Sequence, residues 1–236
     1  MRVSPNDLPT RMHMETEKWS SLALLPIAGT ILIYLFPSSI QKHTIVQFLS
    51  QILAYIGLGI WACANDKLSV RLGLQATQLW IGLRWGCMVG LLLGIGNSLI
   101  ILNIVPALGQ DITFLTQTPH ALAPTVLMLP WVIAAIAIAV ECNFRGFLLG
   151  RLMTLITIRL PHTRLLNSTI AILLSALLFA FDPFMVGTFR HLHWIAVWDG
   201  VIWGWMWVRF NNLYAVIAAH AIEVMVLYVW MKCALT

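Results

Sequence analysis

The amino-acid sequence predicts an all-α protein, a multi-pass transmembrane helical bundle with about seven spans. Composition is the first reason: of 236 residues, 60% are hydrophobic and only 10% are charged. Soluble domains carry about 25% charged residues. The mean hydropathy of +0.86 is the second reason. The third is that the apolar residues gather in runs close to the roughly 17–25 residues that a membrane-spanning helix needs.

Seven runs are apolar and long enough to be spans: 20–36, 45–64, 79–104, 125–148, 165–181, 192–208 and 213–232. The first ends at Pro37, and the second ends at the polar residues 65–67. The third run contains five glycines, at positions 82, 86, 90, 94 and 96, which predict close packing against another helix. The proline-containing connection 105–124 would raise the count to eight spans if it held a broken or re-entrant helix.

Residues 1–18 are predicted to form a polar cytoplasmic N-terminal arm, and residues 19–236 a single membrane domain. The first apolar run is long enough to be a true span rather than a cleaved signal peptide. Lysine and arginine outside the spans mark the cytoplasmic side. With the N-terminus in the cytoplasm, nine of them lie inside: Arg2, Arg11, Lys18, Lys67, Arg71, Arg151, Arg159, Arg164 and Arg209. Three lie outside: Lys42, Arg190 and Lys232. The sequence does not identify the membrane.

The net charge of +5 does not indicate a nucleic-acid partner, because the basic residues are scattered singly at the ends of apolar runs. The four cysteines lie in or beside apolar segments without the spacing of metal ligands or of a disulfide framework. The sequence therefore calls for no metal and no other cofactor.

A carboxylate and a guanidinium stand four residues apart in the fourth apolar region. Glu141 and Arg145 would share one face of a helix, one turn apart. A charge at the centre of a spanning helix costs roughly 2.5–3.5 kcal/mol on the insertion scale, so such side chains usually turn inward and pair. The pair is either an active-site carboxylate held by an arginine or a structural ion pair that locks helices together.

Other polar residues stand in or beside the C-terminal spans. His220 and Glu223 share one face of the last span, where a helix–helix hydrogen bond and a functional site are both open. Asp199 is expected to be structural. Asp182, His191 and His193 could be metal ligands, but their spacing fits no strong site, and a solvated loop is expected there.

Several segments resemble the CPBP family, the CAAX-prenyl endopeptidases and bacteriocin-processing (Abi-like) intramembrane proteins. The family's motifs read E-E-x-x-x-R, usually continued as F-R-G, then F-x-x-x-H, and finally H-x-x-x-N. Similar segments stand in the same order over about residues 125–230: Glu141, 144–151, 175–180, 200–213 and His220, with 72–74 fitting ahead of them. The resemblance implies a membrane-embedded glutamate that activates water for peptide hydrolysis, assisted by histidine and asparagine side chains that stabilise the oxyanion.

Three positions depart from this pattern. Val140 stands where the first glutamate is expected, and Pro183 stands where the second motif has its histidine. Val224 stands where the last motif has its asparagine. The motifs are therefore degenerate at the positions that carry the family's chemistry.

Glu141, Arg145 and His220 remain, and they are the predicted catalytic residues. In an active enzyme, Glu141 would activate water, Arg145 would orient it, and His220 would polarise the carbonyl. Asp182 or Glu223, each one residue from a vacant position, would be a substitute. A shift of one residue turns a helical side chain by about 100°, so adjacent positions are not equivalent.

Two functions remain open. One is a CPBP-like intramembrane endopeptidase with a degraded site, which would hydrolyse peptide bonds within or near the membrane. The other is a catalytically inactive pseudoprotease that binds a membrane or lipidated partner in assembly or immunity. The expected partners are membrane lipid and a transmembrane, prenylated or small peptide. Glu141 and His220 side chains that face different sides of the bundle would exclude a shared site.

Overall fold

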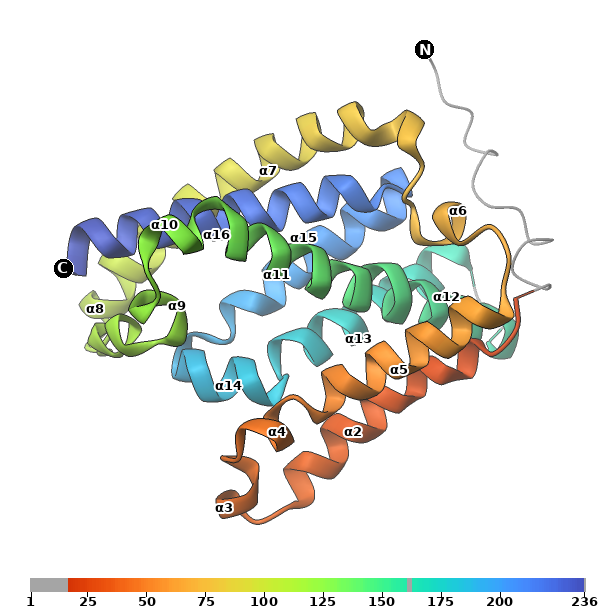
Figure 1. Ribbon diagram of the computed structural model, residues 1–236, viewed down its shortest axis with the longest axis horizontal. Helices are drawn as coiled ribbons and strands as arrows, with labels where there is room; N and C mark the ends of the chain where they lie inside the picture. The colour runs from red at the N-terminus through yellow and green to blue at the C-terminus, as the bar shows by residue number, and fades with distance from the viewer. Residues whose placement is uncertain (1–16, 161–162, 236) are drawn as a thin grey trace.

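A computed structural model describes residues 17–160 and 163–235, and these residues form helices and turns without a β-strand (Figure 1). The predicted all-α, multi-pass membrane bundle is confirmed. Three helical segments are long and apolar enough to cross a membrane: Leu68–Ala107, Thr125–Arg159 and Leu213–Leu235. In the described residues, one helix pair bent by 53°, Arg164–Ala180 and Pro183–Leu192, is apolar enough only when taken together, as a broken span or a re-entrant loop. Because the remaining apolar helices are shorter, the count of seven spans stays a prediction.

The N-terminal half begins with a helical hairpin, continues into a long helix and ends in a connection that contains two short helices. The hairpin consists of η1 (Ser20–Ala23), α2 (Leu24–Leu35), α3 (Ser38–Gln41), α4 (Thr44–Gln47) and α5 (Leu49–Ala64). It is followed by α6 (Leu68–Leu72), η2 (Ala76–Gln78), α7 (Leu79–Leu99), η3 (Ile100–Ile104) and α8 (Val105–Ala107). The connection holds η4 (Thr113–Gln117) and α9 (Pro119–Leu122).

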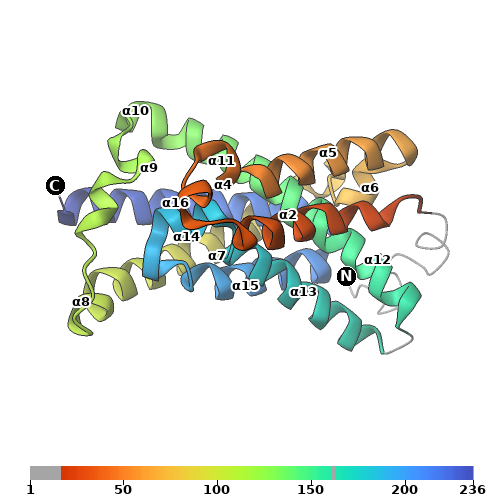
Figure 2. The same cartoon turned by 90° about the horizontal axis from the view of Figure 1, so that it is seen from below.

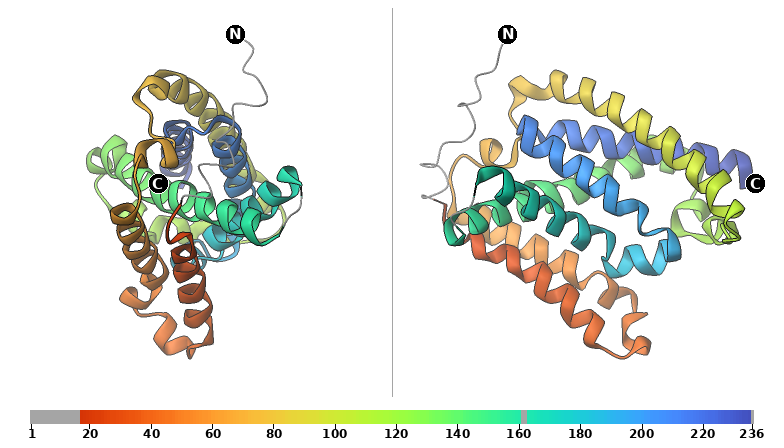
Figure 3. Two further views of the ribbon diagram at one scale, coloured as in Figure 1. Left: turned by 90° about the vertical axis from the view of Figure 1, so that its right-hand side faces the viewer. Right: turned by 180° about the vertical axis from the view of Figure 1, so that it is seen from behind.

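The C-terminal half contains the long element with the predicted motif and five further helices. The long element consists of α10 (Thr125–Leu127), η5 (Met128–Val132), α11 (Ile133–Glu141), the π-helical η6 (Cys142–Leu149) and α12 (Gly150–Arg159). It is followed by α13 (Arg164–Ala180), α14 (Pro183–Phe189), η7 (Arg190–Leu192), α15 (Ile195–Phe210) and α16 (Leu213–Leu235). The α2–α5 hairpin and the α7–α16 pair lie on opposite sides, with α11, α13 and α15 between them (Figures 1 and 3).

The prediction of a solvated loop after Phe181 is wrong. Asp182 is only 1% exposed and caps α14, accepting a hydrogen bond from the Phe184 backbone N–H at 3.1 Å. Pro183 is the first residue of this helix, where its missing N–H costs nothing. The fourth span also continues past its predicted end at residue 148 to Arg159, since α12 extends it.

The glycines of α7 place α16, and the predicted close packing is confirmed for Gly82, Gly86, Gly90 and Gly94 but not for Gly96, where a Cβ would meet nothing within 4 Å. Along their length the two helices lie side by side (Figure 3). A Cβ atom added at Gly86 would lie 2.4 Å from the Ala215 carbonyl oxygen, and one at Gly90 would lie 2.4 Å from that of Ala219. Backbones this close leave no room for a side chain. The glycine face therefore fixes the position of the helix that carries His220 and Glu223.

The turn before α16 is fixed by two asparagines. Asn211 adopts the left-handed conformation that ends α15, with φ 44°. Asn212 accepts a hydrogen bond from the Ala215 N–H at 3.3 Å and donates one to the Gln78 carbonyl at 2.9 Å. The Leu213 N–H binds the Gly73 carbonyl at 2.8 Å. These bonds join the start of α16 to the segment that precedes α7.

The last residues of the predicted N-terminal arm belong to the packed structure, while residues 1–16 of that arm lie outside the described residues. The Glu17 side chain is buried and forms ion pairs with Arg71 of α6, at 3.3 Å, and with Arg151 of α12. It also accepts hydrogen bonds from Trp61 at 2.8 Å and Thr154 at 3.2 Å. One carboxylate thus joins α5, α6 and α12. These three helices meet at the same end of the bundle, as the ribbon in Figure 2 shows.

Candidate functional site

Glu141 lies at the C-terminal end of α11 and is completely buried, with 0% exposure. Its Oε1 atom accepts a hydrogen bond from Nδ1 of His220 at 2.7 Å and one from Nη1 of Arg145 at 3.2 Å. The side chains of Glu141 and His220 therefore face one another across α11 and α16. We call Glu141, Arg145 and His220 the Glu141 cluster. The structure brings together all three residues predicted from the sequence.

Arg145 is held in an aromatic enclosure and is also 0% exposed. Its guanidinium carbon lies 4.8 Å from the ring centroid of Phe179 and 5.1 Å from that of Trp203. Cation–π contacts of this kind help to offset the loss of hydration of a buried guanidinium. Gly200 permits the enclosure, because a Cβ atom there would lie 3.3 Å from Nη2 of Arg145 and 2.9 Å from the Ala176 Cα.

His220 is fixed from two sides. Its ring stacks on Trp203 with centroids 4.4 Å apart and an interplanar angle of 18°. Because Nδ1 faces the Glu141 carboxylate, the hydrogen bond places a proton on Nδ1. In a neutral ring, Nε2 would then be a hydrogen-bond acceptor.

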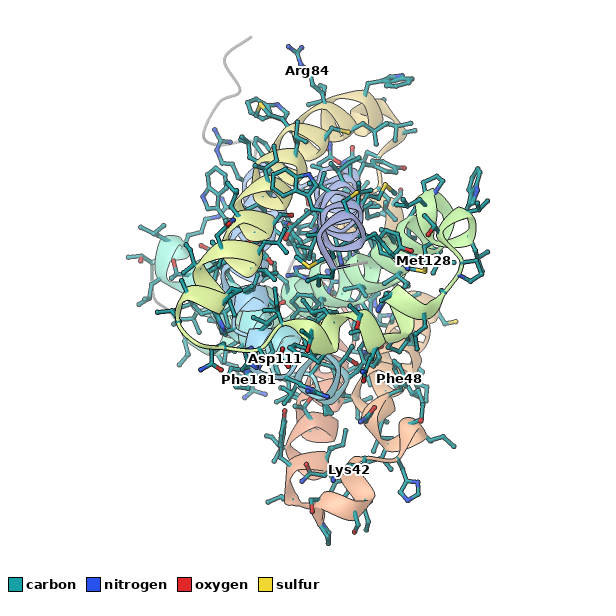
Figure 4. The ribbon with its side chains drawn as sticks, turned by 90° about the vertical axis from the view of Figure 1, so that its left-hand side faces the viewer. Lys42, Phe48, Arg84, Asp111, Met128 and Phe181 are labelled. Atoms are coloured by element: carbon teal, nitrogen blue, oxygen red, sulfur yellow. The ribbon has the colours of Figure 1, made fainter. Side chains whose placement is uncertain are left out.

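A cavity of about 520 Å³ lies beside the Glu141 cluster. Its walls come from α5, α7, η4, α9, α11, η6 and α13 to α16, and most of the lining side chains are apolar. His220 lines the cavity, whereas Glu141 and Arg145 do not. Phe48, labelled in Figure 4, lines it at the hairpin side. His220 therefore reaches the cavity, whereas the Glu141 carboxylate, which was predicted to activate water, does not.

A second polar cluster lies on the cavity wall: Asn97 from α7, Trp198 and Asp199 from α15, and Glu223 from α16. We call it the Asn97 cluster. Nδ2 of Asn97 donates to both carboxylate oxygens of Asp199, at 3.1 and 3.3 Å, and to Oε1 of Glu223 at 2.7 Å. Asn97, Asp199 and Glu223 all line the cavity. Asp199 and Glu223 are 5% and 3% exposed.

The remaining candidates do not converge. Asp182 lines the cavity, but its carboxylate is bound by Ser50 at 2.9 Å and by Gln51 at 3.1 Å as well as capping α14. The His191 ring packs on Phe114, with centroids 5.4 Å apart, and Nδ1 of His193 is bonded to the Arg190 carbonyl. In the part of the chain that the structure describes, no group of three or more His, Cys, Asp or Glu side chains could hold a metal ion.

Residues 122–226 match the family of type II CAAX prenyl endopeptidase Rce1-like proteins. We call these matched residues, 122–226, the Rce1-like domain. This match confirms the resemblance expected over about residues 125–230. No curated protein and no solved structure matches the chain. The Rce1-like domain includes the whole Glu141 cluster, whereas Asn97 lies outside the matched residues.

Two of the three positions that depart from the family motifs lie on the cavity wall. Val140 and Val224 line it, from α11 and α16. Pro183 is buried at the start of α14, next to the cavity-lining Asp182. A cavity thus lies beside the expected site, and two of the positions expected to carry polar groups present valine side chains to it.

Sequence reasoning missed Asn97 and Asn143. Asn97 stands in the middle of an apolar, glycine-rich run, and a polar residue in such a place was the signal that could have found it. Asn143 follows Glu141 by two residues, lines the cavity and is 2% exposed. Its Oδ1 has no hydrogen-bond partner, so an acceptor on the cavity wall is left open.

Proposed function

We propose that the Rce1-like domain binds an apolar chain of a membrane or lipidated partner in its cavity and does not hydrolyse it by the family's mechanism. The observation that carries the proposal is the cavity wall itself, where Val140 and Val224 replace the expected glutamate and asparagine. A positioned general base typically contributes about 10²–10⁴-fold to a reaction. A valine side chain can neither accept the proton of water nor donate to an oxyanion.

The burial of Glu141 supports the same proposal. Its Oε1 is bound by two partners, and the side chain does not line the cavity. A base that activates water needs to lie within hydrogen-bond reach of that water. Through its bond to His220, Glu141 is suited instead to hold α11 and α16 together around the cavity.

The kind of molecule that the cavity binds can be inferred from its lining side chains and from the family that residues 122–226 match. Most of the wall is aromatic or aliphatic, which suits a prenyl group or the side chains of a transmembrane segment. The Rce1-like family takes prenylated peptides as substrates in membranes. We therefore propose a prenylated or transmembrane peptide as the partner, bound with membrane lipid around it.

A substitution that fills the cavity with a larger side chain tests the proposal. Purified protein in detergent is incubated with a photoreactive farnesylated peptide, and labelling and cleavage are followed together. We expect labelling without cleavage, and we expect Val140→Trp to abolish labelling because the indole occupies the cavity. The matched control is Ile138→Trp on the same helix, where the residue is 50% exposed and does not line the cavity. Equal labelling of both variants, or cleavage that depends on Glu141, would refute the proposal.

One observation favours a second function, retained peptide hydrolysis. The 2.7 Å hydrogen bond to Glu141 orients His220, whose ring borders the cavity and could accept a proton from water there. In that case Glu141 positions the base and is not the base. Cleavage of the farnesylated peptide that is lost in His220→Ala, and that falls strongly in Glu141→Gln, would establish this function.

A further inference from the structure

The Glu141 cluster and the Asn97 cluster together contain more acidic than basic side chains. Around the Glu141 cluster and the Asn97 cluster, three carboxyl groups (Glu141, Asp199 and Glu223) surround the single guanidinium of Arg145. Even a protonated His220 would leave one negative charge uncompensated. Buried charges are normally paired, because an isolated ion loses its hydration. Asp199 and Glu223 are hydrogen-bonded to one another, so this pair holds one proton, and a bound cationic group would take the place of that proton.

The side chain of Asn97 does not compensate the negative charge, because an amide is uncharged. Its orientation is also fixed. The Nε1–H of Trp198 donates to Oδ1 of Asn97 at 3.1 Å. The amide nitrogen of Asn97 is thereby turned toward Asp199 and Glu223. It serves as a hydrogen-bond donor and not as an oxygen ligand, so the cluster does not have the oxygen-rich shell that a metal cation prefers.

An acceptor atom of this cluster is left over. Apart from the proton shared with Asp199, no donor group reaches Oε2 of Glu223, although Glu223 is only 3% exposed and lines the cavity. Oδ1 of Asn143 is a second acceptor on the cavity wall without a donor. Buried polar atoms are rarely left unbonded in a folded protein. Two open acceptors on one apolar cavity indicate that its occupant brings hydrogen-bond donors.

We propose that Asp199 and Glu223 bind an alkylammonium group whose apolar chain fills the cavity. This inference rests on the proposed binding function and names the chemistry of the occupant. An ammonium group supplies up to three N–H donors and a positive charge, while the aromatic rings of Phe179 and Trp203 border the same space. The group comes either from an amphiphilic amine or from a lysine side chain of an apolar peptide. Occupants with a carboxylate end are disfavoured.

The test uses three photoreactive probes that share a decyl chain and end in an amine, an alcohol or a carboxylate. Purified full-length protein in neutral detergent is labelled with each, and the cavity peptides are quantified by mass spectrometry. We expect the amine to label the cavity at least about tenfold more than the alcohol, as a charge-assisted hydrogen bond allows. The carboxylate should label least. Asp199→Asn and Glu223→Gln should each reduce amine labelling toward the alcohol level.

The control variant is Asp111→Asn, which removes an exposed carboxylate from the connection between α8 and η4, labelled in Figure 4. It should keep the preference for the amine. Retained alcohol labelling shows that a variant is folded. Competition by an apolar peptide with one lysine, but not by its norleucine counterpart, would assign the ammonium to a peptide, and competition by decylamine alone would assign it to a lipid.

Other outcomes decide against the inference. Equal labelling by the amine and the alcohol overturns it and leaves the proposed binding function standing. Stronger labelling by the carboxylate overturns it as well. The absence of cavity labelling by any of the three probes, alcohol included, refutes both the inference and the proposed function.

Discussion

At the residue scale, Glu141 matters because two buried side chains depend on it. Removal of one partner of a buried ion pair typically costs about 3–5 kcal/mol, since the other charge is left uncompensated. We predict that Glu141→Ala destabilises the protein by this amount, because Arg145 keeps its place among Phe179 and Trp203 without its nearest acceptor. Glu141→Gln should cost less, as its amide oxygen still accepts hydrogen bonds. Unfolding by SDS in mixed micelles measures both, and equal stability of Glu141→Ala and the parent would contradict this account.

His120 makes the stability of the folded protein depend on pH. It lies in α9, where burial lowers the pKa of its imidazole from the usual 6.5. The unfolded chain binds the proton more readily than the folded one, so stability is fully present above pH 6.5 and falls as the pH drops from there toward the lowered pKa.

We therefore predict that acidification from pH 7.5 to 5 lowers the melting temperature of the parent more than that of His120→Phe, which keeps the ring contacts with Phe184 and Phe189. Thermal unfolding followed at both pH values measures the difference. Parallel pH profiles for the two proteins would show that His120 takes no part in it.

At the scale of elements, α7 and α16 form the frame of the cavity. A Cβ atom at Gly90 would lie 2.4 Å from the Ala219 carbonyl oxygen, so Gly90→Ala forces the helices apart. Overpacking of this kind costs about 1–3 kcal/mol. Gly96→Ala is the matched control on the same helix, because its Cβ would meet nothing within 4 Å. We predict lower thermal stability and weaker labelling of the cavity for Gly90→Ala alone, and a neutral Gly90→Ala would show that the pair tolerates separation.

The same elements show where sequence reasoning succeeds. The glycine spacing of α7 predicted its close contact, since glycine at every fourth position has a direct steric consequence. Glu141 and Arg145 could be paired because their spacing is local. Their contact with His220 could be predicted only through the family resemblance, because Glu141 and His220 are 79 positions apart in the chain.

The failures have equally physical reasons. Asp182 and Pro183 were assigned to a loop, although an aspartate followed by proline is also the start signal of a helix. Only burial against Ser50 and Gln51 of α5 decides between the two. Asn97 was overlooked because one asparagine barely changes the hydropathy of its span. Its importance lies in Asp199 and Glu223, which distant segments bring to it.

At the scale of the whole molecule, the cavity requires that the N-terminal hairpin stay docked on the Rce1-like domain. The hairpin supplies Phe48, Gln51 and Tyr55 to the cavity wall, although it lies outside the residues that match the family. Glu17 joins the two parts at one end, since it binds Trp61 of the hairpin and Arg151 of the domain. Trp61 in turn lies under the Arg151 guanidinium, with the carbon atom 3.9 Å from the ring centroid.

We predict that Glu17→Ala loosens this junction and leaves the domain folded. Arg71 and Arg151 would lose a shared carboxylate, and their mutual repulsion would favour separation of α6 from α12. Limited proteolysis should then cut the chain between the hairpin and α7 faster than in the parent, and labelling of the cavity should fall because its hairpin wall moves. Asp66→Asn, which removes a carboxylate at the same end of the bundle, is the control. If Glu17→Ala left both the proteolysis rate and the labelling unchanged, the hairpin would have to be held by its other contacts, among them the hydrogen bonds of Ser50 and Gln51 to Asp182.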